Sequence, residues 1–305
     1  MSRGEFALPD TRALVAAALA EDLGVEPVML APRAGGEALL ARDVTGSLLP
    51  PGSVFAGIVR ARAGGVVAGL PVAQHVWAML AAAAGPDVVD VFPVVAEGTR
   101  VASGDAVLEV SGSARVVLAG ERTALDLLMV LSGIATETRR WREIAGASLA
   151  VCDTRKTLPG LRALSKYAVR VGGGTNHRAG LFDMVLIKDN HIRAAGGITP
   201  AVARSRDLHA DMLIEVEADS IGQAVEAARA GADMVLLDNM DDATLARAVA
   251  AVRDATPAGR VCLTEASGSM TSGRLPALVA AGIDRVSASA LTFAPPLDFG
   301  LDERA

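Results

Sequence analysis

From about residue 149 onward, the chain repeats one hydrophobic pattern. A short β-branched apolar run, in most cases ending on a polar residue, is followed by a turn and an amphipathic helix. Six such runs end at Asp153, Lys188, Glu217, Asp238, Glu265 and Ala288, and the helical segments between them are 159–170, 200–209, 221–230, 243–253 and 273–281. The first five run ends lie 35, 29, 21 and 27 residues apart, which is the length of a βα unit. The pattern predicts a parallel sheet covered by helices.

Nearly every predicted strand of this region ends on a group that can take part in chemistry. This is typical of α/β barrels, in which the carboxyl ends of the strands meet at one site. Six strands are fewer than the eight of a closed barrel. An incomplete or irregular α/β barrel and a regular one therefore both stay open. We expect the barrel, with parallel strands, over residues 129–288, and we expect it to carry the active site.

The first 115 or so residues follow a different pattern. They predict helices over 11–20 and 72–84 and strands over 54–62 and 88–95. Residues 97–114 are expected to form two short strands around Gly104-Asp105, as in a hairpin. Residues 25–42 contain prolines and glycines without periodicity and predict an exposed excursion. Together these features indicate a separate N-terminal α/β (α+β) domain over 1–128, with a mostly helical stretch, 115–147, leading into the barrel.

Composition and charge narrow the class of protein. A chain of 305 residues with 51% hydrophobic and 21% charged residues is globular and long enough for two unequal domains. A net charge of −6 excludes a general attraction to nucleic acid or anionic lipid, so we expect a small-molecule partner. The charge-free stretch 63–86 is interrupted by glycines and prolines and does not resemble a membrane span. Cys152 and Cys262 sit in apolar runs, which favours buried thiols in a cytoplasmic protein.

The stretch 153–191 concentrates positive charge, with seven Lys or Arg residues against three Asp. Arg162, Lys166 and Arg170 recur every four residues, which favours a solvent-exposed helix face. The remaining cations occupy more unusual places. Arg155 and Lys156 follow a strand end, His177 and Arg178 follow a triplet of glycines, and Lys188 closes an apolar strand.

Cations at strand ends call for a charged partner, because removing an ammonium group from water is costly. A bound anion with more than one carboxylate or phosphate would supply that partner, with Arg binding it in bidentate fashion and Lys as a point charge. The triplet Gly172-Gly173-Gly174 is either a flexible turn or a backbone shaped for close approach to a ligand. A Schiff-base role for Lys188 in a barrel aldolase is a further alternative.

Two carboxylates, Glu217 and Asp238, also stand at predicted strand ends. They would either hold Mg²⁺ together with substrate phosphates or accept hydrogen bonds from sugar hydroxyls beside a developing positive charge. The alternative is a structural ion pair with Lys188 or Arg155. Residues 267–269 (Ser-Gly-Ser) and 287–289 (Ser-Ala-Ser) follow the last two strands, where barrel loops bind phosphate, although such turns are also common without a ligand.

The motifs of this region resemble those of the quinolinate phosphoribosyltransferases. The resemblance rests on DTRKTLPGLRALSKYAVRVGGGTNHRAGLFDMVLIKDNH (153–191), on ERTALDLLMVLSGIAT upstream, and on IEVEADS, VLLDNM and EASG downstream. It extends from EDLG near residue 21 to LDFGLD near the end of the chain. A resemblance of this length does not arise by chance.

The resemblance implies an N-terminal α/β domain, an incomplete barrel, and a C-terminal segment, 289–305, that returns to the first domain. It implies a homodimer or a dimer of dimers whose site is completed across the interface, and the substrates quinolinate and phosphoribosyl pyrophosphate with Mg²⁺. Quinolinate would be bound by Thr154, Arg155, His177, Arg178 and Lys188, with Arg122 contributed by the partner subunit. Lys156, Glu217 and Asp238 would be catalytic, Glu217 and Asp238 would hold Mg²⁺, and the phosphoribosyl group would contact Ser267, Gly268, Ser269, Ala288, Ser289 and Ala290.

Some positions depart from the family pattern. Ser269 and Ser289 replace glycines of the phosphate loops, and Phe293 replaces a histidine. Because glycine lets backbone N–H groups approach a phosphate, these changes concern the phosphoribosyl half of the site. Two alternatives therefore stay open: transfer to another aromatic acid, and a catalytically silent protein that binds a dicarboxylate or a sugar phosphate.

Overall fold

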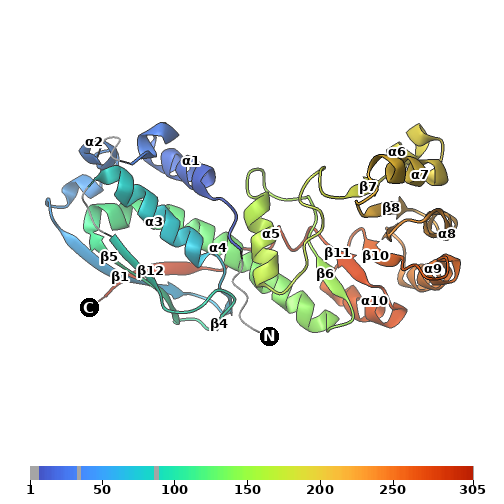
Figure 1. Cartoon of the computed structure of the whole chain (residues 1–305). Helices are drawn as coiled ribbons and strands as arrows, with labels where there is room; N and C mark the ends of the chain where they lie inside the picture. The colour runs from blue at the N-terminus through green and yellow to red at the C-terminus, as the bar shows by residue number, and fades with distance from the viewer. Residues whose placement is uncertain (1–6, 33–35, 86–88, 305) are drawn as a thin grey trace. The chain divides into compact units, whose positions relative to one another are not determined.

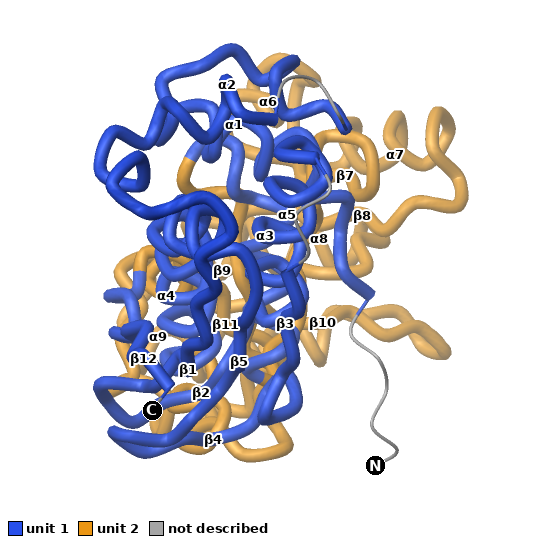
Figure 2. The backbone as a smooth tube through the Cα atoms, turned by 90° about the vertical axis from the view of Figure 1, so that its left-hand side faces the viewer, with its two compact units in different colours: residues 1–137, 159–172, 294–305 blue, residues 138–158, 173–293 orange. Residues whose placement is uncertain are grey.

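The computed structural model describes residues 7–32, 36–85 and 89–304, and the chain divides into two compact units (Figure 2). Unit 1 comprises residues 1–137, 159–172 and 294–305, and unit 2 comprises 138–158 and 173–293. The long helix α4 (Ala114–Ala145) continues from the first unit into the second. The predicted combination of an N-terminal α/β domain and an incomplete α/β barrel is confirmed.

Unit 1 contains a four-stranded antiparallel sheet with the strand order β12-β1-β5-β3 (Figure 1). Its strands are β1 (Val54–Ala61), β3 (Val89–Pro93), β5 (Ala106–Ser113) and β12 (Phe299–Glu303). The edge strand β12 comes from the C-terminal end of the chain and pairs along β1, with Ala61 opposite Phe299 and Gly57 opposite Glu303. The final residues of the chain therefore complete the N-terminal sheet.

The helices of unit 1 are α1 (Arg12–Leu23), α2 (Gly36–Leu40), α3 (Leu70–Ala84) and α5 (Arg162–Val171), with short 3₁₀ turns η1 (Pro27–Leu30) and η2 (Gly46–Leu48). Pro71 lies in the first turn of α3, where its missing N–H costs no hydrogen bond. The helix buries Trp77, whose indole N–H donates to the carbonyl of Val117 at 3.0 Å. Leu30 and Leu39 are also buried, so the prediction of an exposed excursion over 25–42 is wrong for these residues; 33–35 lie outside the described part.

The predicted hairpin around Gly104 is also wrong. The strand β4 (Arg100–Val101) pairs with β2 (Gly65–Val66), whereas β5 lies between β1 and β3. The turn is bound to the end of β1, because Gly104 N–H donates to Ala61 O and Ala61 N–H donates to Asp105 O, at 2.8 and 3.0 Å. Hydrogen bonds to a third strand thus replace the local pairing.

Unit 2 contains a six-stranded parallel sheet in the described part of the chain, in the order β6-β11-β10-β9-β8-β7. Its strands are β6 (Ala150–Cys152), β7 (Val185–Ile187), β8 (Ile214–Ala218), β9 (Met234–Asp238), β10 (Leu263–Ser267) and β11 (Arg285–Ser287). The accompanying helices are α6 (Asp189–Ala195), α7 (Ile198–Leu208), α8 (Ile221–Ala230), α9 (Asp242–Ala255) and α10 (Leu275–Ala281). A short 3₁₀ turn, η3 (Ser272–Arg274), leads directly into α10. Register places Ser267 beside Asp238 and Glu217 beside Leu236, so the strand ends that carry polar groups lie together.

Two predictions about charged residues need correction. The fifth strand runs on to Ser267, so Glu265 lies inside the strand and is fully buried, which is tolerated because Arg285 Nε donates to it at 2.8 Å. The solvent-exposed face predicted for α5 is wrong at Lys166, which is only 4% exposed. Its helix packs within unit 1, where the neighbouring Tyr167 donates to Glu97 at 2.7 Å. In the described part of the chain, no helix is long and apolar enough to span a membrane.

Candidate active site

A cavity of about 430 Å³ opens at the carboxyl ends of the unit 2 strands. Its lining is mostly polar and charged, with two apolar side chains, Leu186 and Leu236. Asn239 and Ser287 line the cavity together with eleven of the site residues predicted from the sequence: Thr154, Arg155, Lys156, His177, Arg178, Lys188, Glu217, Asp238, Ser267, Gly268 and Ser269. The barrel therefore brings together residues that are more than 100 positions apart in the chain.

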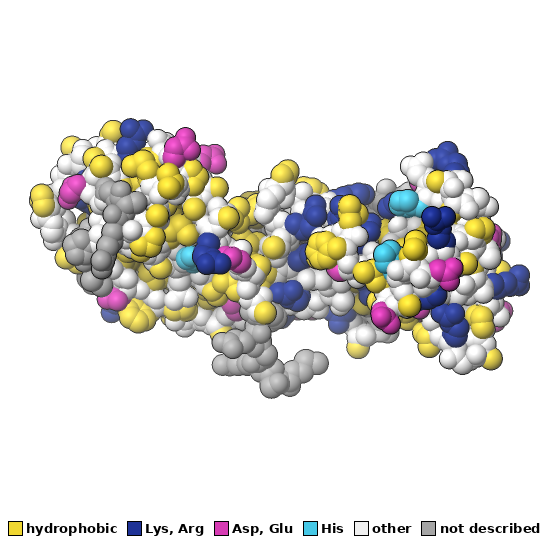
Figure 3. Space-filling view, turned by 45° about the horizontal axis from the view of Figure 1, so that its top comes forward, with side chains coloured by type: hydrophobic (Ala, Val, Ile, Leu, Met, Phe, Trp, Pro, Cys, Tyr) yellow, Lys and Arg dark blue, Asp and Glu magenta, His cyan; other side chains and the backbone are white. Residues whose placement is uncertain are grey.

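The cations of the cavity are poorly compensated by their own chain. Arg155 Nε is buried and has no hydrogen-bond partner among the described residues. The pKa of Arg178 is lowered, first by burial and then by the like charge of Arg155. Lys156 is exposed, and none of these three side chains has an ion pair within the described chain. Cations without an anionic partner at one cavity favour an anionic ligand. On the face that Figure 3 shows, Lys and Arg side chains lie among hydrophobic and acidic ones.

Opposite charges stand on the neighbouring strands. Lys188 Nζ forms an ion pair with Glu217. This is the ion pair that the sequence analysis names as the alternative role of this carboxylate. The backbone N–H of Lys188 donates to His191 Nδ1 at 3.0 Å. Asp238 accepts a hydrogen bond of 2.7 Å from the side-chain amide of Asn239. The carboxylates of Glu217 and Asp238 thus face the cavity with defined partners.

Asn239 is a cavity residue that the sequence reasoning missed. It has φ = 53°, an uncommon value for a residue other than glycine, and its N–H donates to Ser267 O at 3.1 Å. Its signal in the sequence is a polar residue directly after a strand, in VLLDNM. Asn239 thereby joins the end of β9 to the loop after β10.

The loop after β10 is shaped by its glycine. Gly268 has φ = 89° and Ser269 has φ = 47°, and a Cβ added to Gly268 would collide with the side chain of Asn239. Backbone N–H groups of successive residues in such turn conformations can bind an anion, so the loop suits a phosphate.

Replacing Gly268 by alanine is expected to cost about 1 to 3 kcal/mol of stability, because the left-handed backbone is strained for an L residue and Asn239 must move. We also expect weaker binding of a sugar phosphate. Chemical denaturation and calorimetry with phosphoribosyl pyrophosphate measure the two effects. Gly259→Ala, at φ = 80° with no atom within 4 Å of the added Cβ, is the matched control for backbone strain alone. Equal effects of the two substitutions would contradict a role for the collision.

Other predicted residues do not line this cavity. Ala288, Ser289 and Ala290 follow β11, where Ala288 N–H donates to Cys152 O at 3.1 Å and Ser289 O accepts from Thr292. Thr292 Oγ1 also donates to Lys156 O at 2.6 Å, which ties this turn to the segment that carries Lys156. Arg122 lies on α4 in unit 1, where it is 62% exposed and pairs with Asp126. Their contacts with substrate stay predictions.

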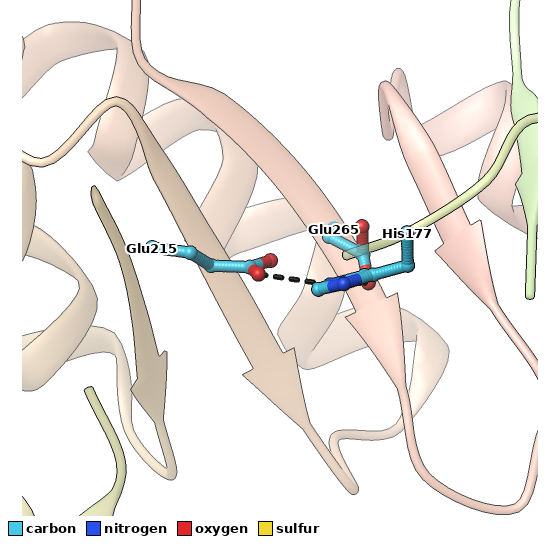
Figure 4. Close-up of side chains that lie close together, drawn as sticks. All are labelled: His177, Glu215 and Glu265. Carbon is cyan, nitrogen blue, oxygen red and sulfur yellow. Dashed lines mark ion pairs between the residues drawn. The ribbon is translucent and has the colours of Figure 1, made fainter. Parts of the chain in front are cut away.

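Below the cavity lies a buried cluster of charged residues, of which Figure 4 shows His177, Glu215 and Glu265. His177 Nε2 is 2.9 Å from Glu215 Oε2 and 3.4 Å from Glu265 Oε1. Burial and the neighbouring Glu265 raise the pKa of Glu215. Burial opposes the charged form of His177, but the two carboxylates outweigh it and raise the pKa of the ring. The sequence places each of the two glutamates in a predicted strand, but it does not show that both side chains meet His177.

The site also suits a hard divalent cation. Glu217 and Asp238 provide carboxylate oxygens and Asn239 an amide oxygen at neighbouring strand ends, and Mg²⁺ prefers one or two carboxylates combined with substrate phosphates. The donor set is therefore consistent with a metal ion that arrives with a phosphorylated substrate.

The fold and the site together define a class. The strand ends of this incomplete α/β barrel carry cations without an anionic partner in the described chain, two carboxylates and a loop with positive φ values, and such an enzyme site suits polyanionic and phosphorylated ligands.

The comparisons with known proteins identify the family. "Quinolinate phosphoribosyl transferase, C-terminal domain" matches residues 134–302, and the N-terminal domain of the same family matches 43–132. The chain therefore belongs to the quinolinate phosphoribosyl transferase family, and it is an enzyme of the pentosyltransferase class.

Individual relatives agree with this assignment. A probable nicotinate-nucleotide pyrophosphorylase [carboxylating] from Synechocystis sp. is 44% identical over 245 residues, covering 79% of this chain and 80% of the relative. The protein of that name from Mycobacterium leprae is 40% identical, covering 85% and 89%. The structure of NadC from Streptococcus pyogenes superposes with a TM-score of 0.82 at 35% identity, covering 97% of each chain.

Proposed function

We propose that this enzyme transfers the phosphoribosyl group of phosphoribosyl pyrophosphate to quinolinate, with loss of CO₂. The products are nicotinate mononucleotide, pyrophosphate and CO₂, so the reaction belongs to NAD biosynthesis. Membership of the family and the names of the relatives support the reaction. The observation that carries the proposal is the pair of arginines, Arg155 and Arg178, which line the cavity without an anionic partner in the described chain.

The two arginines and Lys188 suit the two adjacent carboxylates of quinolinate. Arginine binds a carboxylate in bidentate fashion, whereas the Lys188 ammonium already has a carboxylate partner in Glu217 and can exchange it for substrate. Leu186 and Leu236 offer apolar surface for the aromatic ring, and Thr154 lies beside the cations. Binding of the diacid would satisfy the charges that the free protein leaves uncompensated.

The remaining polar residues of the cavity are assigned to the phosphoribosyl group and the pyrophosphate. The loop 267–269 would bind the 5′-phosphate through its backbone N–H groups, and Lys156 would contact pyrophosphate oxygens. Glu217 and Asp238 would face the ribose and would hold Mg²⁺. When bound, the metal ion would neutralise charge on the departing pyrophosphate.

In this mechanism, the bond between C1′ and pyrophosphate breaks and the pyridine nitrogen of quinolinate forms the new bond to C1′. The carboxylates of Glu217 and Asp238 stabilise the positive charge that develops on the ribose. The C2 carboxylate, now adjacent to a pyridinium nitrogen, leaves as CO₂. Its bonding electrons stay on C2, where the neighbouring positive nitrogen stabilises them until a proton from solvent binds there. Orientation and electrostatics supply most of the catalysis, and no protein nucleophile is required.

A coupled assay tests the proposal. Purified protein with Mg²⁺, phosphoribosyl pyrophosphate and quinolinate should release pyrophosphate and CO₂ in equal amounts, and nicotinate, which has one carboxylate, should release neither at a comparable rate. Turnover with another aromatic acid and not with quinolinate would identify a related transferase. Binding of quinolinate without turnover would identify a binding protein, and either result would overturn the proposal.

We further propose that the enzyme is a homodimer or a dimer of dimers in which Arg122 reaches the site of the partner subunit. Exposed apolar side chains of unit 2 support an interface, because Leu181 and Phe182 are each 74% exposed beside an apolar cavity of about 610 Å³. Sedimentation should give a mass of two chains or more. A mixture of Arg122→Ala and Lys188→Ala chains should recover activity that neither variant has alone, because mixed dimers contain one intact site.

The two cysteines, Cys152 and Cys262, are free and buried, and burial raises the pKa of Cys262 to about 11. Inert thiols of this kind support our proposal of a cytoplasmic location.

A further inference from the structure

The buried cluster beneath the cavity contains more charge than the reaction uses. Glu215 and Glu265 are both completely buried, on strands β8 and β10, which flank β9, and neither lines the cavity. Glu265 is compensated by Arg285, whose Nε donates to Oε2 at 2.8 Å. Glu215 has no hydrogen-bonded cation of this kind: its ion-pair partner is the ring of His177 at 2.9 Å, the carboxylate of Glu265 lies close by, and Arg285 acts on it only through space. A buried carboxylate without compensation costs several kcal/mol, so its retention calls for an explanation.

Both nitrogens of the His177 ring are engaged within the chain. Nδ1 accepts a hydrogen bond of 2.8 Å from the backbone N–H of Arg178, so its lone pair is used and the ring proton belongs on Nε2. Nε2 faces Glu215 Oε2 at 2.9 Å and Glu265 Oε1 at 3.4 Å. The backbone N–H of His177 donates to Asp153 Oδ1 at 3.0 Å. The residue is therefore held at three points, and the ring links the glutamates below to the backbone of Arg178 above.

We propose that Glu215 and Glu265 are positioning residues: they fix the orientation and the proton of the His177 ring and, through the Arg178 N–H bond to that ring, the placement of the Arg178 guanidinium. The inference rests on the proposed function, because Arg178 is assigned there to the diacid. It explains why the segment after the glycine triplet, which lacks helix and strand structure at 176–178, can present an arginine at a defined place.

A buried metal ion is the main alternative for this cluster. One ligand atom each from His177, Glu215 and Glu265 lies within 4.8 Å of the others, which would allow a shared cation. However, Arg285 already supplies a positive charge at Glu265, and the pKa of Arg285 is raised by its acidic surroundings in spite of burial. A second cation would be repelled by the guanidinium. The arrangement therefore favours the imidazole as the partner of Glu215.

A double-mutant cycle tests the proposal. Glu215→Ala should weaken quinolinate binding about tenfold and leave the affinity for phosphoribosyl pyrophosphate within about twofold. Glu215→Gln keeps an acceptor for Nε2–H and should restore most of the quinolinate affinity. In the His177→Ala background, Glu215→Ala should cause no further loss, because its effect passes through the ring. Additive losses, or equal losses for both substrates, would overturn the proposal.

Two controls separate this outcome from loss of fold and from failure of the proposed function. Asp284→Asn removes a carboxylate that binds Thr264 at the other end of β10, so it should lower thermal stability without a change in the ratio of the two affinities. If wild-type protein does not bind quinolinate, the proposed function fails. The placement of the ring proton is then still testable by nitrogen NMR of the four histidines in mildly alkaline buffer, where His177 should carry its proton on Nε2. A ring proton on Nδ1, or one equivalent of metal lost on Glu215→Ala, would overturn the positioning role.

Discussion

Arg178→Ala is expected to weaken quinolinate binding about 100-fold or more, while the affinity for phosphoribosyl pyrophosphate changes less than about threefold. The substitution removes a half-buried guanidinium and with it a charge-assisted, bidentate contact to a carboxylate, an interaction that contributes about 3 kcal/mol when buried. Isothermal titration with each substrate measures the two affinities separately.

The surface arginine Arg247 on α9 provides a control for this substitution, since its side chain is exposed and hydrogen-bonds to Thr244 of the same helix. Arg247→Ala should leave both affinities unchanged. If Arg178→Ala weakened the two substrates equally, the division of the cavity into a diacid half and a phosphoribosyl half would be wrong.

Asp238→Asn is expected to lower kcat by a factor of about 10² to 10³ and to leave quinolinate affinity nearly unchanged. The amide keeps the shape of the side chain and an oxygen for the Asn239 hydrogen bond, but removes the charge that stabilises the transition state and attracts Mg²⁺. Steady-state kinetics over a range of Mg²⁺ concentrations should show a higher metal requirement in addition to the lower kcat.

Asp254 is the matched control for the loss of this charge. It lies on α9, the helix that follows β9, and its side chain is exposed. Asp254→Asn changes the net charge equally and should not alter kcat. A loss of quinolinate affinity in Asp238→Asn as large as the loss of kcat would indicate that Asp238 supports the fold of the cavity and not the reaction.

Much of the barrel and its site could be predicted from local patterns. Apolar runs and spacings identified the six parallel strands, and the rule that strand ends converge brought Arg155, Lys188, Glu217 and Asp238 to one cavity. These features depend on periodicity and on chain order, both of which are visible in a single sequence. The helix over 115–147 could also be predicted from the sequence, and it is observed as α4.

The features that were missed depend on contacts between distant segments. The pairing of β4 with β2 could not be predicted, because two short strands around Gly104 are most simply interpreted as a local hairpin. Lys166 was assigned to a solvent-exposed face because helical spacing alone does not show what packs on a helix. Glu215 and Glu265 were overlooked because alternation along a strand does not reveal that a buried position faces a histidine from another loop. Asn239 was missed because positive φ values are set by tertiary structure.

The pairing of β12 with β1 affects how the chain is made. The edge of the sheet at residues 57–61 is covered only when residues 299–303 are present, so the whole segment between them must leave the ribosome before this sheet is complete. Contacts of such long sequence separation slow folding, because a large loop has to close first. During synthesis, β1 remains an open edge able to pair with other strands, which exposes the nascent chain to aggregation until β12 is made.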